Sequence, residues 1–266
     1  MAGPSLFAEL RAARRVWAVG AVHGEAERLR RLHGLLLPRL KPGDRLVYLG
    51  NILGRGAGVR AALDEALAFR RGFLAARNAF VHDIAFLRGA QEEMWQRLFQ
   101  LQFAVNPSEV FAWMLTQGVG VTLEAYGMRI DEATSAIRQG PMAITRWAGR
   151  LRAAFQGAPG HQEYLSSLKR AAYTRDGSLL FVHRGIDPER PLEAQGDVFW
   201  WGTRAFDQIE APFAGFRTVV RGFDPQHRGL KITNCTASLD AGCGFGGALI
   251  AGCFTPDGAL ADSIEA

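Results

Sequence analysis

Short apolar runs alternate with glycine turns and helical patterns through the first 105 residues. The runs are rich in Val, Leu, Ile and aromatic residues, and we predict strands at 15–19, 45–49 and 84–87. After each run, apolar residues recur at three- and four-residue spacing, which predicts helices over 25–37, 59–73 and 92–103. This alternation of strand, glycine loop and helix is typical of βαβ crossovers, so we expect a largely parallel sheet.

The pattern changes after about residue 105. Between 105 and 170 the apolar residues keep helical spacing, which predicts a helical insertion and not a second independent domain. Short apolar runs then return between Gly and Pro turns, so we expect a second sheet, richer in antiparallel pairs. Its predicted strands are 179–182, 217–221, 230–234 and 248–254. No repeat or linker separates the halves, and we therefore predict one α/β domain over 1–266.

Composition narrows the classes of function. The net charge of +5 comes mostly from arginines dispersed along predicted helices, and no basic cluster interleaved with aromatic residues occurs. This argues against a nucleic-acid partner, although the basic pI keeps one open as an alternative. The three cysteines show no CxxC spacing, which argues against a disulfide framework and a structural zinc site. The same cysteine pattern fits a reducing cytoplasm, so we expect a cytoplasmic protein. No uninterrupted apolar run of about 18 residues occurs, so we expect no membrane partner.

Polar residues and glycines follow the predicted strands. In open α/β sheets, functional groups gather beyond the carboxyl ends of the strands, so these turns are the candidate site. The five blocks are Gly-Ala-Val-His-Gly at 20–24, Gly-Asn-Ile-Leu-Gly-Arg-Gly at 50–56, Arg-Gly-Ala-Gln-Glu at 88–92, Val-His-Arg-Gly at 182–185 and Arg-Gly-Phe-Asp-Pro at 221–225.

In these blocks the chain resembles the calcineurin-like metallophosphoesterases, of the bacterial serine/threonine phosphatase type. That family carries G-D-x-H-G, G-D-x-x-D-R-G, G-N-H-E, V-H-A-G and G-H-T-P in the same order, and the resemblance covers residues 15–257. It implies a four-layer sandwich, with two mixed β-sheets flanked by helices and a helical insertion. It also implies hydrolysis of phosphate esters by two metal ions that activate a bridging hydroxide.

The metal-ligand positions implied by this resemblance are largely substituted. Two histidines remain, His23 and His183, while Asn51 puts a neutral amide where an aspartate bridges both metals in the family. The ligand positions that have lost every donor atom are Ala21, Ala90 and Phe223. Hard divalent cations need anionic ligands to offset their lost hydration, so this remnant is insufficient for metal binding. We expect no cofactor; an active protein would use a divalent metal such as Mn, Fe or Zn.

The catalytic positions are changed as well. Gln91 stands where the family has its catalytic histidine, and Gly54 replaces the aspartate that orients that histidine. A glutamine cannot titrate near neutral pH as an imidazole does. Arg55 is retained at a phosphate-contacting position; it either keeps that role or pairs with a carboxylate near a helix N-terminus. A second phosphate-binding arginine of the family corresponds to Thr203.

Other side chains could replace lost ligands. The candidates are Asp224, Glu92, Cys235 and Cys243. A single carboxylate on the far loop cannot rebuild two metal sites.

These substitutions predict a pseudophosphatase, a protein that keeps the phosphatase fold and is not an enzyme. It would act as a binding or regulatory scaffold for a phosphorylated or otherwise anionic ligand, or for a protein partner. The alternative is a phosphoesterase with residual or rewired metal-dependent activity.

Overall fold

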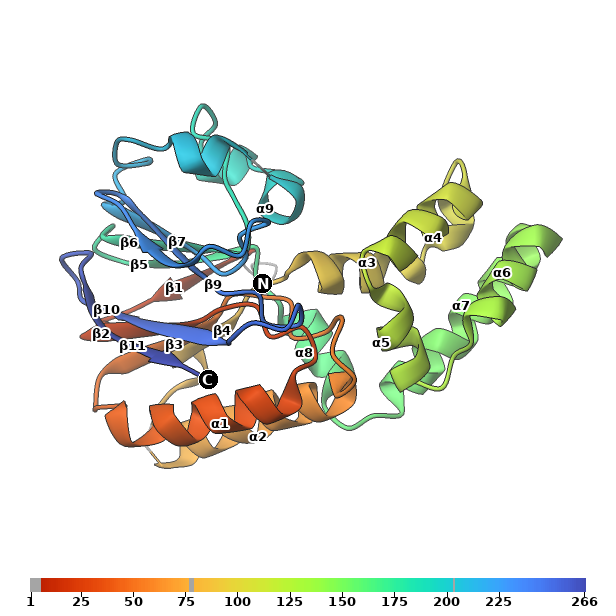
Figure 1. The fold of residues 1–266 in the computed structure, drawn as a ribbon, viewed down its shortest axis with the longest axis horizontal. Coiled ribbons are helices and arrows are strands. Elements are labelled where there is room, and N and C mark those ends of the chain that lie inside the picture. Colours follow the sequence, from red (N-terminus) through yellow and green to blue (C-terminus); the bar gives the residue numbers. More distant parts are fainter. Residues whose placement is uncertain (1–5, 77–78, 203) are drawn as a thin grey trace, which may run out of the picture.

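Two β-sheets pack face to face at the centre of the protein (Figure 1). This computed structural model describes the chain apart from residues 1–5, 77–78 and 203. The six-stranded sheet has the order β1-β5-β6-β7-β9-β8 and the five-stranded sheet the order β11-β10-β2-β3-β4. The strands are β1 (Phe7–Leu10), β2 (Arg15–Val19), β3 (Asp44–Tyr48), β4 (Ile84–Phe86), β5 (Ala171–Thr174), β6 (Leu179–Val182), β7 (Thr218–Arg221), β8 (Gly229–Ile232), β9 (Thr236–Asp240), β10 (Ile250–Phe254) and β11 (Leu260–Glu265).

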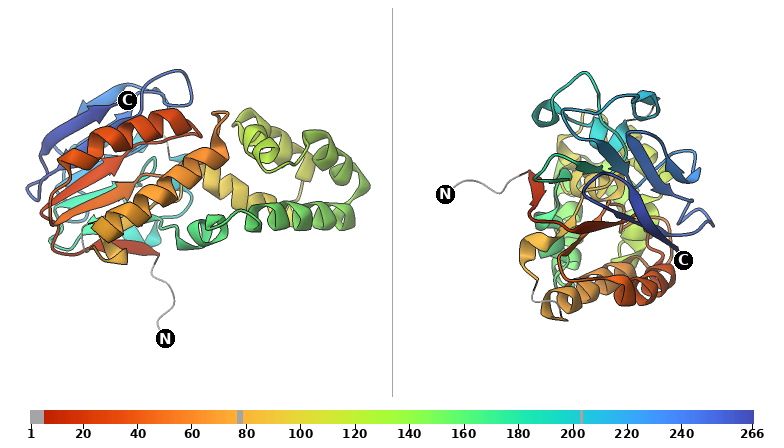
Figure 2. Two further views of the ribbon diagram at one scale, coloured as in Figure 1. Left: turned by 90° about the horizontal axis from the view of Figure 1, so that it is seen from below. Right: turned by 90° about the vertical axis from the view of Figure 1, so that its left-hand side faces the viewer.

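Helices cover both outer faces, and a group of helices projects to one side (Figures 1 and 2). The α-helices are α1 (Ala26–Leu36), α2 (Val59–Ala76), α3 (Ala90–Leu98), α4 (Pro107–Thr116), α5 (Val119–Ala125), α6 (Ile130–Gln139), α7 (Pro141–Gln156), α8 (His161–Ser167) and α9 (Val198–Trp201). Short 3-10 helices are η1 (Leu37–Arg39), η2 (Val81–Asp83), η3 (Leu101–Phe103), η4 (Leu192–Ala194) and η5 (Arg204–Gln208). Helices α1 and α2 lie along the five-stranded sheet, while α9 lies on the outer side of the other sheet.

The core is divided among these layers. Between the sheets, inward-facing residues such as Val16, Phe181 and Phe254 form one apolar cluster. A second cluster packs α9 against the six-stranded sheet, and the largest joins α1 and α2 to the five-stranded sheet and continues into the projecting helices. Continuous burial of apolar side chains therefore links the sandwich to α4–α7.

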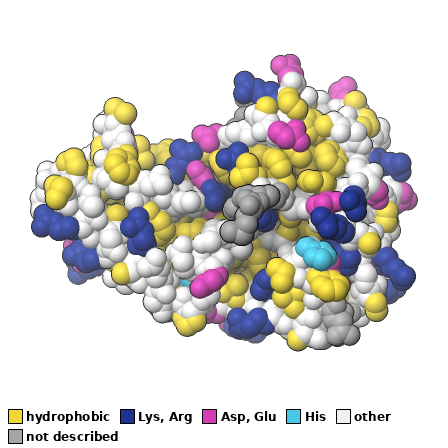
Figure 3. Space-filling model, turned by 180° about the vertical axis from the view of Figure 1, so that it is seen from behind, with side chains coloured by type: hydrophobic (Ala, Val, Ile, Leu, Met, Phe, Trp, Pro, Cys, Tyr) yellow, Lys and Arg dark blue, Asp and Glu magenta, His cyan; other side chains and the backbone are white. Residues whose placement is uncertain are grey.

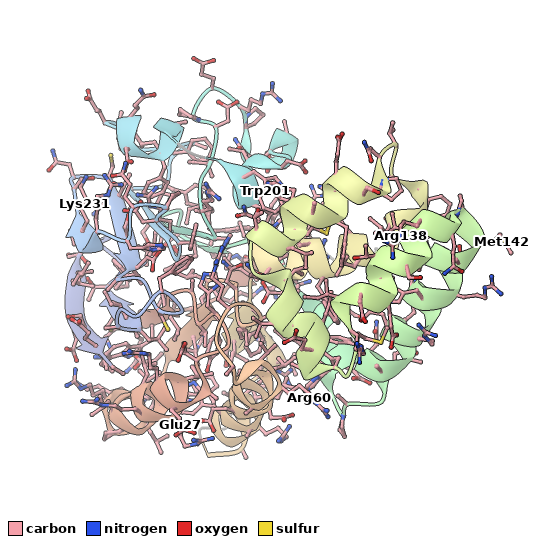
Figure 4. All side chains as sticks on the ribbon, turned by 45° about the vertical axis from the view of Figure 1, so that its right-hand side comes forward. Glu27, Arg60, Arg138, Met142, Trp201 and Lys231 are labelled. Atoms are coloured by element: carbon pink, nitrogen blue, oxygen red, sulfur yellow. The ribbon has the colours of Figure 1, made fainter. Side chains whose placement is uncertain are left out.

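The projecting helices, called the arm below, are α4 to α7, and they fall within the segment 105–170. At its base, the Trp113 ring of α4 packs edge-on against Trp201 at the end of α9, with 5.1 Å between ring centres. Figure 4 shows Trp201 at this junction and places Arg138 and Met142 at the far end of the arm. The arm is thus attached to the sandwich next to the loops that follow the central strands.

The predicted α/β architecture of two mixed sheets with flanking helices is confirmed, and β2, β3 and β4 are parallel. The expectation of a second sheet richer in antiparallel pairs was wrong. Among the described residues, β1–β5, β6–β7 and β7–β9 are parallel, while β5–β6 and β8–β9 are antiparallel. The physical reason is the length of the connections. The segment between β6 and β7 contains α9 and η5, and the segment between β7 and β9 contains β8, so each is long enough to bring the chain back to the end of the sheet where the previous strand began, as parallel pairing requires.

The run at 248–254 was also assigned to the wrong sheet. Strand β10 pairs with β2 and β11 in the five-stranded sheet. All of its residues are buried, which suits a strand that is covered on both faces. Across the described residues, no helix is both long enough and apolar enough to span a membrane.

Candidate functional site

The five sequence blocks meet at one end of the sandwich, where their loops bond to each other through the backbone. The Ala21 N–H donates to the Gly222 carbonyl at 2.9 Å, and the Gly222 N–H donates to the His183 carbonyl at 3.0 Å. The Val22 N–H donates to the Asn51 carbonyl at 3.0 Å. Because β2, β3, β6 and β7 all end here, the fold brings together residues that lie up to 200 positions apart in the chain.

Two of the retained residues hold an uncommon backbone conformation. His23 and Asn51 both have φ of +54°, in the left-handed region, which costs a non-glycine residue of order 1 kcal/mol or more. Their side chains are in contact, since the Asn51 Nδ2 lies 3.2 Å from the His23 Nε2. The Asn51 Oδ1 accepts from the Gln91 N–H at 2.9 Å. The amide of Asn51 thus holds His23 on one side and the start of α3 on the other.

Glu92 fixes the loops that surround Asn51. Its two carboxylate oxygens accept backbone N–H bonds from Asn51 at 2.8 Å, Gly89 at 2.9 Å and Leu53 at 3.0 Å, and a hydroxyl bond from Tyr164 at 3.2 Å. The side chain is fully buried, and this burial raises the pKa of Glu92. With its oxygens engaged in this way, Glu92 is a structural residue and does not replace a lost metal ligand.

The two retained histidines are buried and neutral. The His183 Nδ1 lies 2.8 Å from the Leu49 carbonyl, so this nitrogen carries the proton and donates. Burial lowers the pKa of His183 to about 3, and burial together with the nearby His183 and Arg55 lowers the pKa of His23 to about 3. The His183 Nε2 and the His23 Nδ1 have no hydrogen-bond partner among the described residues.

Phe223 fills the space next to both imidazoles. Its ring centre lies 5.6 Å from that of His23, edge-on, and 5.7 Å from that of His183, nearly parallel. Phe245 also packs edge-on against His23 at 5.3 Å. These aromatic contacts and the burial of His23 and His183 make the position an apolar cluster and not an open pocket.

The donor set does not fit two divalent cations. Two neutral imidazoles and one amide contribute no negative charge, whereas Mg²⁺, Mn²⁺ and similar ions are held by carboxylates. Within the described part of the chain, no three His, Cys, Asp or Glu side chains are grouped as a metal would require. Ala21 and Ala90 are buried without any donor atom at the two other ligand positions.

Asp224 does not supply the missing charge. Its Oδ2 accepts from the Arg228 Nε at 2.6 Å, and its Oδ1 lies 3.2 Å from the Arg221 Nη2. The Asp224 side chain is 1% exposed, and its two arginine partners neutralise it. These ion pairs tie the loop after β7 to η5, since Arg221 and Arg228 also pair with Asp207.

The two candidate cysteines remain thiols. The Cys243 Sγ lies 3.2 Å from the Val22 carbonyl, and burial raises the pKa of Cys243 to about 12. The Cys235 Sγ lies 3.3 Å from the Ile209 carbonyl, and burial also raises its pKa. A metal-binding cysteine is a thiolate, so these environments oppose ligation.

The neighbouring loops pack closely around Gly54. Gly54 has φ of +139°, and a Cβ built there would lie 2.7 Å from the His23 Nδ1 and 3.1 Å from the Gln91 Cγ. An aspartate, which the family has here, does not fit this packing. The Gln91 side chain turns away and donates through Nε2 to the Gln117 carbonyl at 2.8 Å, at the end of α4.

Arg55 lies at the rim of this cluster. Its Nη2 donates to the Thr116 carbonyl at 3.1 Å, and its guanidinium carbon is 4.6 Å from the centre of the Phe245 ring. Among the described residues no carboxylate forms an ion pair with Arg55, so the pairing alternative finds no support. Thr203, the position of a second phosphate-binding arginine in the family, lies outside the described residues.

Three residues at the site were missed by sequence reasoning. Arg184 places its guanidinium carbon 5.4 Å from the Phe223 ring centre, and its buried Nε has no partner among the described residues. His227 lies between the Phe223 and Phe245 rings. Arg184 directly follows His183 and could have been suspected from that adjacency. Phe245 and His227 come from distant turns that carry no local signal.

The chain is similar in fold to several solved structures, although its sequence matches no family model and no curated protein. Among solved structures, one described as a diadenosine tetraphosphatase has a TM-score of 0.54 at 20% identity and covers 97% of both chains. A cold-active protein tyrosine phosphatase has a TM-score of 0.54 at 16% identity, covering 95% of this chain and 79% of its own.

A third solved structure is a protein serine/threonine phosphatase from Saccharomyces cerevisiae. Its TM-score is 0.50 at 13% identity, over 92% of this chain and 76% of the yeast protein. At such low identities the likeness concerns the fold alone. The chain has the α/β sandwich fold of these phosphatases, as its resemblance to the metallophosphoesterases implied.

Proposed function

We propose that this protein is a pseudophosphatase, in which the phosphatase fold persists without metal-dependent hydrolysis. The observation that carries the proposal is the position of the Phe223 ring, packed against both retained histidines where the family has a metal ligand. An aromatic ring offers no donor atom, and it excludes the water that a hydroxide nucleophile requires.

The chemistry of the remaining side chains supports the same proposal. A dinuclear centre activates water because two dications lower its pKa, and those ions need anionic ligands. His23, His183 and Asn51 are neutral at pH 7. Gln91 stands at the catalytic-histidine position and cannot deliver a proton to a leaving group.

The proposed role is that of a binding or regulatory scaffold. Arg55 and Arg184 lie beside aromatic rings at the edge of the cluster, and guanidinium groups in such positions suit a phosphorylated or otherwise anionic ligand on a protein partner. We propose no nucleic-acid or membrane partner, and we propose a cytoplasmic location.

Elemental analysis and an assay of phosphate-ester hydrolysis on the purified protein test this proposal. We expect less than one metal ion per chain after dialysis and no turnover above the metal-free background. Two metal ions per chain, or metal-dependent turnover that is lost in His183→Ala, would show that the alternative of a rewired phosphoesterase is correct.

A revertant serves as the positive control. It restores the family residue at six positions together: Ala21→Asp, Asn51→Asp, Gly54→Asp, Ala90→Asn, Gln91→His and Phe223→His. Circular dichroism must confirm that it folds, because the new side chain at position 54 meets His23 in the present packing. Metal uptake by the folded revertant shows that the assay would have detected a competent site.

A further inference from the structure

A groove of about 630 Å³ lies on the side of the sandwich where the edge strands of the two sheets, β1 and β4, come together. Its volume falls within the range of about 300–1,000 Å³ that is typical of small-molecule sites. The groove shares no residue with the loops at 20–24, 50–56, 182–185 or 221–225. It is therefore a separate candidate site, independent of the proposed loss of catalysis.

The floor of the groove is apolar. The half-buried Phe7 of β1 and Tyr173 of β5 and the exposed Val81 supply its accessible apolar surface, and the buried Ile84, Ala85 and Phe86 of β4 complete the lining. Figure 3 shows this back face of the molecule, where hydrophobic side chains gather near the centre with Lys and Arg side chains around them. An apolar floor of this kind binds a hydrocarbon chain through removal of both surfaces from water.

The rim of the groove has an excess of positive charge. Its acidic lining residue, Glu9, already pairs with Arg11 at 3.2 Å and with Arg175 at 2.9 Å. Arg70 of α2 also lines the groove, is partly buried, and forms no ion pair with a carboxylate among the described residues. Lys169 adds a further cation to the lining. An anionic ligand would give Arg70 the partner that no described carboxylate provides.

We propose that the groove binds an anionic amphiphile. Its single hydrocarbon chain would lie against Phe7, Tyr173 and Val81, and its carboxylate or similar head group would pair with Arg70. This orientation follows from the lining, because the accessible apolar side chains come from β1, β5 and η2 while Arg70 comes from α2. A partly buried guanidinium holds a carboxylate more strongly than an exposed one does, since water screens the pair less.

Two amphiphiles of equal carbon number and opposite charge test the proposal. Decanoate and decylammonium each contain ten carbon atoms, one of which is the carboxyl carbon in decanoate. Each can be titrated into the full-length protein below its micelle concentration by calorimetry. We expect decanoate to bind at least about tenfold more tightly. Equal affinity for the two, or preference for decylammonium, would overturn the proposal.

Variants locate the binding. Arg70→Gln should weaken decanoate binding by about fivefold or more, whereas Arg71→Gln, its exposed neighbour outside the groove, should leave it within about twofold. Ser166→Trp places a large ring at the exposed edge of the groove and should block binding, while thermal unfolding verifies that the variant folds. Equal effects of the two arginine variants, or unimpaired binding by Ser166→Trp, would place the ligand elsewhere.

A vesicle experiment separates a free amphiphile from a membrane surface. Vesicles of phosphatidylglycerol present the same anionic head and apolar chain as an extended surface. We expect the protein to bind monomeric decanoate and to remain in the supernatant when such vesicles are sedimented. Co-sedimentation without binding of monomeric decanoate would overturn the proposed ligand.

Discussion

The buried histidines His23 and His183 should make the protein sensitive to acid. In the folded chain, burial lowers the pKa of each to about 3, whereas an imidazole in the unfolded chain titrates near 6.5. Below pH 6.5 the unfolded state therefore binds protons that the folded state does not. The free energy of unfolding should fall as the pH drops from about 6.5 towards 3, and these two groups should add no pH dependence above that window.

The size of the effect follows from these pKa values. At pH 5, an unfolded imidazole is almost fully protonated while the folded one is neutral, so each histidine lowers the free energy of unfolding by about 2 kcal/mol. Together they remove about 4 kcal/mol from a total that is typically 5–15 kcal/mol. With a urea dependence of about 3 kcal/mol per molar, the unfolding midpoint should move down by about 1 M between pH 7.5 and pH 5.

Urea unfolding followed by tryptophan fluorescence at several pH values measures this effect. His23→Gln and His183→Gln should each flatten the dependence between pH 5 and 6 by up to about 1.4 kcal/mol per pH unit, which is the loss of one titrating group. The slope separates this effect from any constant destabilisation by the substitution. His82→Gln, at a side chain that is 52% exposed, is the control for removal of a histidine outside the buried cluster.

Unchanged slopes in both histidine variants would refute the reasoning. The same conclusion would follow if the wild type lost no stability between pH 6.5 and 5. His33 is present in every variant, and its own burial-lowered pKa contributes equally to each, so it does not affect the comparison.

Two further predictions concern the packing of the loops. Glu92→Gln should lower the free energy of unfolding by about 2–4 kcal/mol in a urea titration, because a neutral amide offers one acceptor oxygen where the buried carboxylate accepts from four donors. Tyr164→Phe removes one of those donors and should lower the free energy of unfolding by about 1 kcal/mol. Gly244→Ala should be more destabilising than Gly246→Ala by at least about 1 kcal/mol in thermal unfolding. Both glycines have left-handed φ, but only a Cβ at 244 would clash with the His23 side chain. Equal losses would mean that backbone strain alone decides.

Much of the fold was predictable because its signals are local. Strand β6 spans the predicted 179–182, and helix α1 (Ala26–Leu36) differs by one residue at each end from the predicted 25–37. The pairing of β10 with β2 was not predictable, because the choice of sheet depends on contacts between segments more than 200 residues apart. Strands β1, β5, β9 and β11 were missed. The segments of β9 and β11 mix Thr, Ser, Asp and Glu with apolar residues, and those of β1 and β5 have only four residues each with few large apolar side chains, so none stands out as an apolar run.

For the candidate site, the positions of the residues were predictable from the sequence, but the environments of their side chains were not. Motif positions located His23, Asn51 and His183 because the loops after β2, β3 and β6 converge whatever their side chains are. The burial, protonation and contacts of those side chains were not predictable from the spacing of the motifs along the sequence. Their burial, the pKa values of about 3 and the contacts with Phe223 and Phe245 depend on how distant turns close over them.

The loops remain in place through groups that do not involve a metal. Asn51 and His23 keep the left-handed backbone, which is unfavourable by itself, so other contacts must offset its cost. Glu92 provides three backbone hydrogen bonds on one side, and the Arg221–Asp224 pair anchors the loop after β7 on the other. These contacts hold the backbone of the loops without a carboxylate at position 21 or 51. The observed loop conformation is therefore compatible with the proposed pseudophosphatase, in which binding would persist without cleavage.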